Sequence, residues 1–468
     1  VIEPGSACCD VVRAAAKDAW GRLISPSLER EIRNELTDKA NEGAIRVFGD
    51  NLHQLLMQPP IRGKVTLGVD PGFRTGCKLA VVDETGKVLE TGVGYFTLPN
   101  HEAQKPRAKA QILGMIRRHG VTAIAIGNGT ASRESEQFIA ALLPEAPGVA
   151  YVIVSEAGAS VYSASKLAAK EFPEYDVSLR SAVSIARRMQ DPLAELVKID
   201  PKAIGVGQYQ HDLKQAELEN ALSGVVESCV SSVGVDVETA SASLLTHVAG
   251  IGEALANNIV AYRDENGIAS RAQLKKVPKL GPKAYEQCAG FLRVPESKNV
   301  LDNTGVHPES YGAAEKLLAL CGCGDEDVRR GAVDGLMQRV QAMGEAKVAE
   351  EIGVGVPTLR DVVKELMKPG RDLRSDLPAP ILRTDVLDMK DLKPGMVLTG
   401  TVRNVIDFGV FVDIGVHQDG LVHISQVCSR FIKHPSEVVA VGDIVKVLVL
   451  DVDEKKHRIS LSMKQVKE

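Results

Sequence analysis

Five short stretches of alternating apolar and polar residues lie at the C-terminal end of the chain and constrain its fold more than any other feature. They cover 397–405, 407–415, 419–425, 443–451 and 458–463. Alternation with a period of two is typical of strands that bury one face, and glycine or aspartate stands at an end of three of these stretches. Five such strands are enough to close a small OB β-barrel, which we expect over residues 393–468.

Three ring-bearing residues fall on adjacent strands of this expected barrel. Phe408 and Phe411 are three positions apart, and His423 lies on the next strand. In a straight strand this spacing points the two phenylalanines to opposite faces, so a bulge is needed to bring both rings to one face, and Gly409 is the candidate for it. Exposed rings on an OB sheet stack on bases while cations hold the backbone. The alternative is that both rings belong to the barrel core.

This C-terminal block resembles, nearly motif for motif, the RNA-binding OB domain named after small-subunit ribosomal protein S-one. The resemblance implies that five residues line an RNA-binding face: Phe408, Phe411, His423, Asp453 and Arg458.

A second group of strands predicts a mixed sheet over residues 64–198. Apolar runs cover 65–69, 77–82, 87–93, 121–126 and 150–154, and helical stretches cover 102–119, 132–143, 160–171 and 179–189. Three meandering strands followed by alternating helices and strands are typical of a mixed α/β sheet with helices on its faces.

Acidic residues end several of these elements. Asp70 follows the first strand, Glu156 follows the last strand, and Asp191 follows a helix. In a mixed sheet the first and fourth strands can be neighbours, which would bring Asp70 and Glu156 together. Clustered carboxylates hold the ions of two-metal phosphoryl chemistry. The alternative is that Asp70 only caps the turn formed with Pro71 and Gly72.

Three short motifs in this region resemble the RNase H-like fold of the YqgF and RuvC-resolvase group. They are Asp-Pro-Gly at 70–72, Gly-Asn-Gly-Thr at 127–130 and Ser-Glu at 155–156. The resemblance implies Asp70, Glu156 and Asp191 as an acidic catalytic trio. A nuclease of this kind would need Mg²⁺ or Mn²⁺, whereas a binding protein requires no cofactor. The fold also hosts inactive members, so it does not by itself supply an activity.

Two helix–turn–helix units with glycine turns predict a tandem helix-hairpin-helix over residues 244–294. The turns contain Gly250 and Gly252 in the first unit, and Gly281 with Lys283 in the second. Glycine lets a phosphate approach the backbone, and the following helix N-terminus offers free N–H groups. This segment contains seven lysines and arginines and four acidic residues, so its net charge is positive. Phosphate binding and simple structural packing both remain open.

The remaining segments are mainly helical, and the length of 468 residues implies several domains. We expect a helical segment over 1–63, a helical connector over 199–243, a helical scaffold over 295–375 and a linker over 376–392. The expected fold class is therefore a multidomain α+β chain: an RNase H-like mixed α/β domain, a tandem helix-hairpin-helix, a helical scaffold and a five-stranded OB β-barrel.

Composition excludes several other classes of protein. Hydrophobic residues at 44% and charged residues at 25% exclude a disordered or fibrous chain. The net charge of -5 means that nucleic acid must bind through local patches. The eight cysteines lack zinc-site spacing, which favours reduced thiols and a cytoplasmic protein. No apolar run approaches the roughly 18 residues that span a membrane.

The order of these domains resembles the bacterial Tex family of transcription accessory proteins and, more distantly, the eukaryotic Spt-type elongation factors. Family members carry a further helical region upstream, so we expect this chain to lack an N-terminal region. The resemblance implies a cytoplasmic factor that binds RNA and single-stranded DNA, largely without sequence specificity, and works with the transcription machinery. A metal-dependent nuclease and a protein-binding scaffold are the alternatives.

Overall fold

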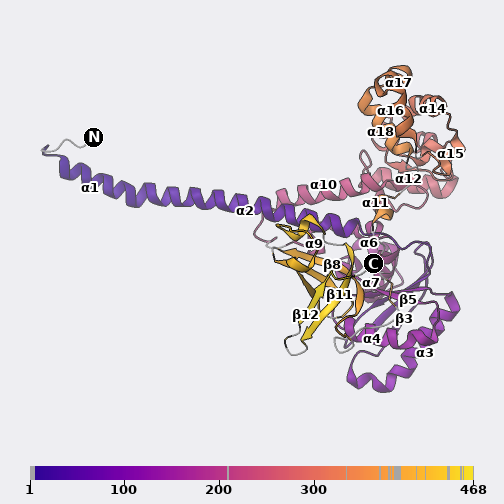
Figure 1. The fold of residues 1–468 in the computed structure, drawn as a ribbon, viewed down its shortest axis with the longest axis horizontal. Helices are drawn as coiled ribbons and strands as arrows, with labels where there is room; N and C mark the ends of the chain where they lie inside the picture. The colour runs from indigo at the N-terminus through magenta and orange to yellow at the C-terminus, as the bar shows by residue number, and fades with distance from the viewer. Residues whose placement is uncertain are drawn as a thin grey trace.

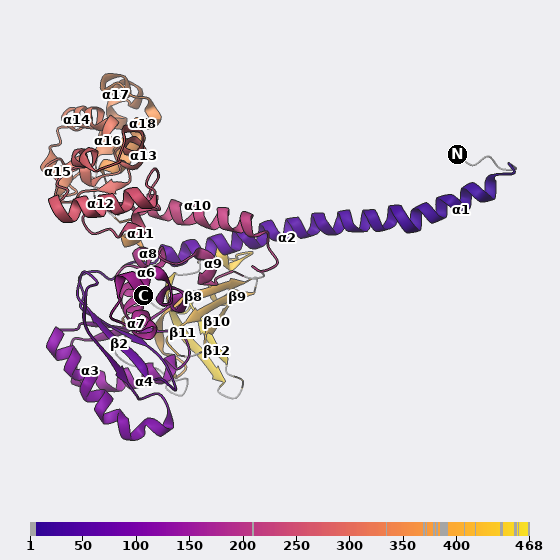
Figure 2. The same cartoon turned by 180° about the vertical axis from the view of Figure 1, so that it is seen from behind.

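The computed structural model describes residues 6–207, 210–333, 335–367, 370, 372–377, 380, 382–383, 392–406, 408–416, 418–439, 443–453, 456 and 458–466. A long helix projects from the body, and the rest of the chain forms two lobes (Figure 1). One lobe holds a sheet domain with a β-barrel beside it, and the other is mostly helical (Figure 2). The predicted fold class, a multidomain α+β chain with a five-stranded C-terminal barrel, is confirmed.

The projecting helix is built from α1 (Cys9–Ala19), the π-helical segment η1 (Trp20–Ile24) and α2 (Ser25–Leu56). Only the end of α2 is buried. There Phe48 and Leu52 pack into a core shared with α10 (Gln215–Val233). Their four-residue spacing places both side chains on the face of α2 that meets α10.

The sheet of the N-terminal domain has the strand order β3-β2-β1-β4-β5. The antiparallel part of the sheet joins β1 to β2 and β2 to β3, and the parallel part joins β1 to β4 and β4 to β5. The predicted adjacency of the first and fourth strands is therefore confirmed. The strands are β1 (Thr66–Asp70), β2 (Cys77–Val82), β3 (Val88–Gly94), β4 (Ala123–Gly127) and β5 (Ala150–Val154).

Helices cover both faces of this sheet. Residues of α3 (Lys105–His119) and α4 (Ser132–Leu142) pack on one face, and α7 (Val177–Gln190) packs on the other. Gly68 in β1 permits the close approach of α7, because a Cβ atom there would lie 2.2 Å from the carbonyl oxygen of Ala182. The remaining helices of this region are η2 (Pro99–Gln104), η3 (Leu143–Glu145), α5 (Ala159–Ser163), α6 (Lys166–Glu171), α8 (Pro192–Leu196) and α9 (Pro201–Ile204).

The second lobe is joined to the body by α10. The core of its first part continues through α10 to the end of α2 and to α8, and its second part has a core of its own. Its first part comprises β6 (Val235–Asp236), α11 (Ala242–Leu245), α12 (Glu253–Asn266), η4 (Arg271–Lys276), α13 (Pro282–Cys288) and β7 (Leu292–Arg293). Its second part comprises η5 (Val300–Asn303), η6 (Pro308–Ser310), α14 (Tyr311–Leu320), α15 (Asp325–Arg329), α16 (Leu336–Met343), α17 (Glu345–Ile352) and α18 (Val356–Leu366).

A fully buried arginine joins these two parts. The Arg271 guanidinium donates to the carbonyl oxygens of Leu292, Leu301, Thr304 and Val306, at 2.5–3.2 Å. These carbonyl oxygens replace the water that the buried charge has lost. Because they come from both parts of the lobe, the arginine holds the two parts together.

The C-terminal barrel closes in the order β10-β12-β11-β8-β9. Its strands are β8 (Val397–Ile406), β9 (Gly409–Asp413), β10 (Gly420–His423), β11 (Ile444–Asp453) and β12 (Arg458–Ser462). Short 3₁₀ segments η9 (Ile424–Gln426) and η10 (Pro435–Glu437) lie between β10 and β11. The barrel has its own core of apolar side chains from residues 392–461.

A single arginine of the predicted linker fastens the barrel to the sheet domain. Its backbone forms two hydrogen bonds of 2.8 Å with Tyr151, on the edge strand β5. The guanidinium of this residue, Arg383, then lies 3.9 Å from the Glu136 carboxylate and 3.6 Å from the Asp413 carboxylate of β9. The linker thus covers part of an open sheet edge. Most other residues of the predicted linker lie outside the described residues.

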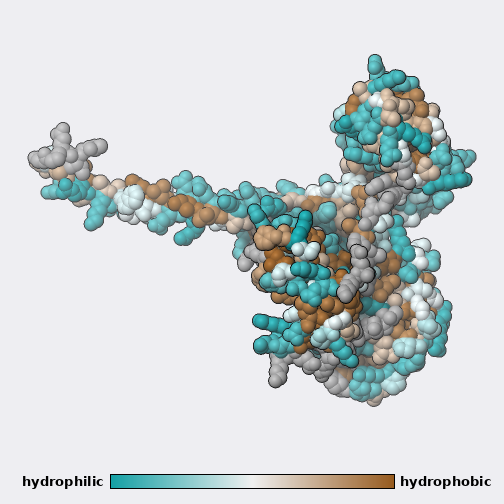
Figure 3. All heavy atoms as spheres, viewed as in Figure 1, coloured by the Kyte–Doolittle hydropathy of each residue, from teal (hydrophilic) through white to brown (hydrophobic). Residues whose placement is uncertain are grey.

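Apolar side chains show along the projecting helix and over the barrel (Figure 3). In the part of the chain that the structure describes, no helix is both long and apolar enough to cross a membrane.

Candidate nucleic-acid interface and acidic site

The barrel presents one continuous outward face across β9, β10 and β12. Val410 and Val412 of β9 point into the core, so Phe411 between them points outward and is half-buried. Phe411 pairs with Leu421 of β10, which pairs with Ser460 of β12. Arg458, two residues before Ser460, is also exposed. The register therefore places Phe411 and Arg458 on the same side of the barrel.

Phe408 and His423 lie at one end of this face. Phe408 precedes β9 and is 54% exposed, and the Ile424 N–H donates to its carbonyl oxygen at 2.9 Å. Gly409 pairs with His423, whose Nδ1 accepts the Ser425 N–H at 3.3 Å. The neutral His423 ring therefore carries its proton on Nε2. The alternative interpretation placed both phenylalanine rings in the barrel core. The exposure of Phe408 and the outward direction of Phe411 contradict it.

The predicted bulge is in a different place. The register between β8 and β9 shifts between Val402 and Asn404, opposite Phe411, and not at Gly409. Phe408 reaches the face because it lies in the turn before β9 rather than in the strand.

The other predicted pair, Asp453 and Arg458, forms a cross-strand pair at the end of β11 and β12. Asp453 accepts the backbone N–H of Lys456 at 3.1 Å. The Lys456 ammonium also lies 3.6 Å from the Asp453 carboxylate. Both predicted residues thus sit at the hairpin end of the face, away from His423.

One exposed aromatic residue of the barrel was not predicted as a site residue. Phe431, in the segment between η9 and η10, is 90% exposed. Its sequence neighbours Arg430 and Lys433 are exposed cations, and this Arg-Phe-x-Lys pattern was the available sequence signal.

The two helix-hairpin-helix turns are exposed, and each contacts a helix of the other unit. Gly250 has φ +79°, and a Cβ atom there would lie 2.9 Å from the Gln287 side chain of α13. Asn258 of α12 donates to the carbonyl oxygen of Pro278 at 2.9 Å. Gly252 and Gly281 are the N-caps of α12 and α13, where the backbone leaves N–H groups open.

The basic residues around these turns differ in their surroundings. Lys283 is exposed in the first turn of α13, as phosphate binding requires. The Lys275 ammonium instead lies 4.7 Å from the centre of the Tyr285 ring. Part of the positive charge counted in the sequence is therefore in contact with an aromatic ring of the same domain.

In the sheet domain, the structure brings two of the three predicted carboxylates together. Asp70 ends β1, and Glu156 lies two residues beyond β5. Burial raises the pKa of Asp70, although a Ser181 hydrogen bond and the Lys78 charge oppose the effect. Burial raises the pKa of Glu156 as well, and the neighbouring Asp70 charge raises it further. Glu156 is therefore close enough to Asp70 for the Asp70 charge to act on its pKa.

The two glycines of the Gly-Asn-Gly-Thr motif make this approach possible. Glu156 must cross the end of β4 to reach Asp70. A Cβ atom at Gly129 would lie 1.4 Å from Glu156 Oε1, and one at Gly127 would lie 2.7 Å from Oε2. Asn128 Oδ1 accepts the Glu156 N–H at 3.0 Å and fixes the turn. Side chains at either glycine would displace the carboxylate.

Asp191 does not join this pair, which corrects the predicted acidic trio. Its carboxylate accepts two hydrogen bonds from the buried Arg374 guanidinium, at 2.7 and 3.2 Å. It also accepts the Ala194 N–H as the N-cap of α8. Asp372 completes the contact by accepting from the same guanidinium at 2.7 Å. Asp191 is thus an anchor for the segment that follows α18.

The groups that face Asp70 and Glu156 do not fit a two-metal site. The helix α7 that covers the pair contains no aspartate or glutamate, and it offers the Ser181 hydroxyl and the Arg188 guanidinium. Arg188 Nη1 donates to the carbonyl oxygens of Ser155 and Ala157, at 2.9 and 2.7 Å, and so holds the turn carrying Glu156. No three histidine, cysteine, aspartate or glutamate side chains within the described ranges lie close enough to hold a metal ion.

Replacing Asp70 with asparagine is expected to raise the thermal midpoint at pH 7.5 in EDTA. A carboxyl group with a raised pKa stabilises the fold most fully below its ordinary pKa of 3.8, and that stability is lost as the pH rises through the higher folded pKa. The asparagine variant avoids this loss, so its advantage should shrink at pH 4. Melting curves at both pH values test the sign.

The control for this prediction is Asp83→Asn. Although burial opposes it, hydrogen bonds from Thr85 and Lys87 lower the pKa of Asp83, and this variant should therefore be destabilised at pH 7.5. A thermal midpoint for Asp70→Asn below that of the parent at pH 7.5 would contradict the raised pKa of Asp70.

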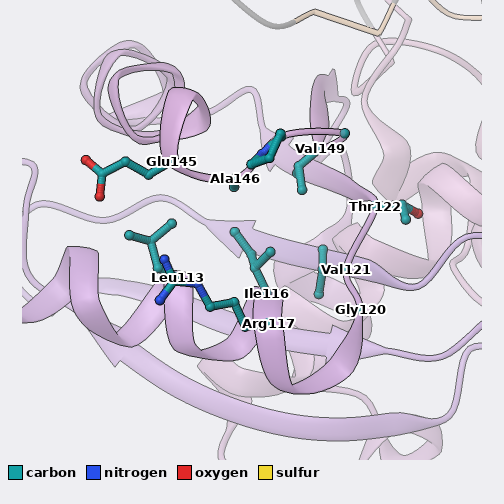
Figure 4. A pocket seen from close by; sticks show the side chains of 11 residues that line it. Leu113, Ile116, Arg117, Gly120, Val121, Thr122, Glu145, Ala146 and Val149 are labelled. Carbon is teal, nitrogen blue, oxygen red and sulfur yellow. The ribbon is translucent and has the colours of Figure 1, made fainter.

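An open pocket of about 370 Å³ lies in the same domain but away from these residues (Figure 4). Ile116 and Val121 line it from the end of α3, and Val149 lines it from the start of β5. It lies before the starts of β4 and β5, whereas Asp70 and Glu156 lie at the opposite ends of the strands, where β1 and β5 finish. The pocket is therefore separate from the acidic pair.

Comparison with protein families matches four parts of the chain. The models are the Tex protein YqgF-like domain over 64–190, the helix-hairpin-helix motif over 230–293, the HHH domain over 299–374 and the S1 RNA binding domain over 391–464.

Curated relatives match nearly the whole chain. An uncharacterized protein YdcI of Bacillus subtilis strain 168 is 54% identical over 97% of this chain and 63% of its own length. A protein named tex from Bordetella pertussis is 51% identical over 95% of this chain and 56% of its own length. A protein named transcriptional accessory protein Tex from Neisseria gonorrhoeae is 50% identical over 97% of this chain and 59% of its own length. The chain thus spans less than two thirds of these relatives.

Proposed function

This chain belongs to the family of Tex proteins, and from that premise we propose that it is a nucleic-acid-binding transcription accessory factor. It binds RNA and single-stranded DNA mainly through the C-terminal barrel, largely without sequence specificity. The observation that carries the proposal is the outward face of the barrel, where Phe408 and His423 are exposed beside Phe411 in a domain that matches the S1 RNA binding model.

The chemistry of that face suits single strands. Rings stack on the faces of unpaired bases, and every base has such a face, so stacking supplies affinity without strong sequence preference. Arg458 adds a cation for the phosphate backbone on the same side of the barrel. Paired bases in a duplex do not offer their faces to protein rings, which favours single-stranded partners.

The helix-hairpin-helix turns are proposed as a second, weaker surface for phosphates. Gly250, Gly252, Gly281 and Lys283 are exposed and lie at the turns or in the first turn of the following helix. Contacts of this kind position a backbone and carry no sequence information. The printed name of the Neisseria gonorrhoeae relative, transcriptional accessory protein Tex, supports work with the transcription machinery, and a cytoplasmic location completes the proposal.

No catalytic role is proposed for the sheet domain. The alternative of a Mg²⁺- or Mn²⁺-dependent nuclease requires clustered carboxylates, and the arginine and the serine that face Asp70 and Glu156, Arg188 and Ser181, do not favour it.

Binding with and without residues 393–468 tests the proposal. The barrel has its own core, so its removal should leave the other domains folded. We expect the shortened chain to lose most of its affinity for single-stranded RNA and DNA of several unrelated sequences. Binding by the whole chain should weaken steeply as salt rises. Equal affinity with and without the barrel would contradict the proposal, and circular dichroism of both chains controls for folding.

A further inference from the structure

Phe431 is the most exposed of the large apolar side chains in the described part of the chain, at 90%. It lies on the barrel, in the segment between β10 and β11. A fully solvated phenylalanine forgoes the stabilisation that burial would give its ring. A ligand that covers the ring would supply this stabilisation.

The segment that carries the ring is held firmly. Val427, Ile432 and Val439 are buried in the barrel core on either side of it. The backbone N–H groups of Lys433 and His434 both donate to Glu437 Oε1, at 2.9 and 3.1 Å. Ile432 points inward directly after Phe431, so the ring is presented outward by an anchored segment.

Cations flank the ring. Arg430 and Lys433 are exposed, and residues 428–434 contain no acidic side chain. Among the described residues, neither cation forms an ion pair; Arg430 makes only a 3.5 Å contact with the Glu437 carbonyl oxygen. A single aromatic ring between two exposed cations suits a base with its neighbouring phosphates. A protein partner would instead require a broader apolar patch.

The segment begins at the ring-bearing end of the proposed binding face. It leaves β10 directly after His423, and the first residue of η9, Ile424, is bonded to the Phe408 carbonyl oxygen at 2.9 Å. A single-stranded nucleic acid that passes over Phe411 and then Phe408 therefore leaves the binding face at the point where this segment starts.

We propose that Phe431, with Arg430 and Lys433, forms a second stacking position for the same single-stranded RNA or DNA. This inference rests on the proposed function and deepens it. The barrel then binds a longer strand than the face of Phe408, Phe411 and His423 alone could hold. Short oligonucleotides occupy that face only, and longer ones also reach Phe431.

The test measures fluorescence anisotropy of labelled oligouridines of increasing length, from about 4 to 16 nucleotides, the range of OB-fold site sizes. Phe431→Ala is expected to weaken the longest oligomer by about 5- to 150-fold, the loss of one stacked base, and to leave the shortest unchanged. Phe431→Trp should restore binding. Trp20→Ala removes another exposed aromatic ring, 57% exposed on the projecting helix, and serves as the matched control.

Two outcomes separate this inference from the proposed function. If Phe431→Ala binds every length as the parent does while Phe408→Ala is weakened, the second stacking position is wrong and the proposed function stands. If neither substitution weakens any oligomer, both are wrong. A length-dependent loss in Phe431→Ala and Arg430→Gln, but not in Trp20→Ala, supports the inference.

Discussion

Replacing Phe408 and Phe411 together with alanine is expected to weaken single-stranded RNA binding by about 5- to 150-fold for each ring that stacks a base. Phe408 is 54% exposed, and Phe411 points outward between two core valines, so the rings are accessible without rearrangement of the barrel. Titration of a labelled oligonucleotide at fixed salt measures the loss.

The matched control for the double substitution is Val397→Ala. Val397 is also an exposed apolar residue of the barrel, 52% exposed on β8, and its removal should leave affinity unchanged. The stacking assignment fails if the double variant, with an intact barrel by circular dichroism, binds RNA as tightly as the parent.

Replacing Asp191 with alanine is expected to lower the free energy of unfolding by about 3 kcal/mol. This value is at the low end for breaking a buried ion pair, because Arg374 keeps its contact with Asp372. The Arg374 side chain is 1% exposed, so its charge cannot regain water when Asp191 is removed. The substitution also removes the N-cap of α8. Urea denaturation measures the difference.

Arg62→Ala is the control for this second prediction. Arg62 contacts the same two carboxylates, at 3.4 and 3.0 Å, but its side chain is 61% exposed. Exposed ion pairs contribute little, so we expect a loss below about 1 kcal/mol. Comparable losses in the two variants, or no loss in Asp191→Ala, would show that the buried contact does not anchor the segment.

Periodicity in the sequence was sufficient for most of the fold. Alternation of period two located the five barrel strands, which bury one face, and short apolar runs located the five strands of the sheet, which is covered by helices on both faces. The Gly-Asn-Gly-Thr motif at 127–130 was noted only for its family resemblance, and the structure adds that Glu156 lies over Gly127 and Gly129.

Contacts between segments that are distant in the chain could not be predicted from the sequence. Asp191 ends a helix before Pro192, and nothing nearby indicates that Arg374, 183 residues later, is buried against it. Likewise, Arg383 lies in a segment of linker composition, yet it pairs with Tyr151 and reaches Asp413. Such contacts depend on how domains pack, and local patterns do not encode that packing.

The ring positions were only partly predictable. The spacing of Phe408 and Phe411 required an irregularity, which was expected at Gly409, but a strand irregularity can lie on either partner of a pair. Phe431 was missed because a lone aromatic residue in a loop has no periodic neighbours; its flanking cations were a short sequence signal, and its 90% exposure is known only from the structure.

The most direct test of the central claim is to map where single-stranded RNA touches the intact chain. Oligonucleotides that contain 4-thiouridine can be cross-linked by light and the attached peptides identified by mass spectrometry. We expect cross-links at Phe408, Phe411 and His423 on the barrel face. Cross-links confined to residues 64–190 or 244–294, with none on the barrel, would contradict the account.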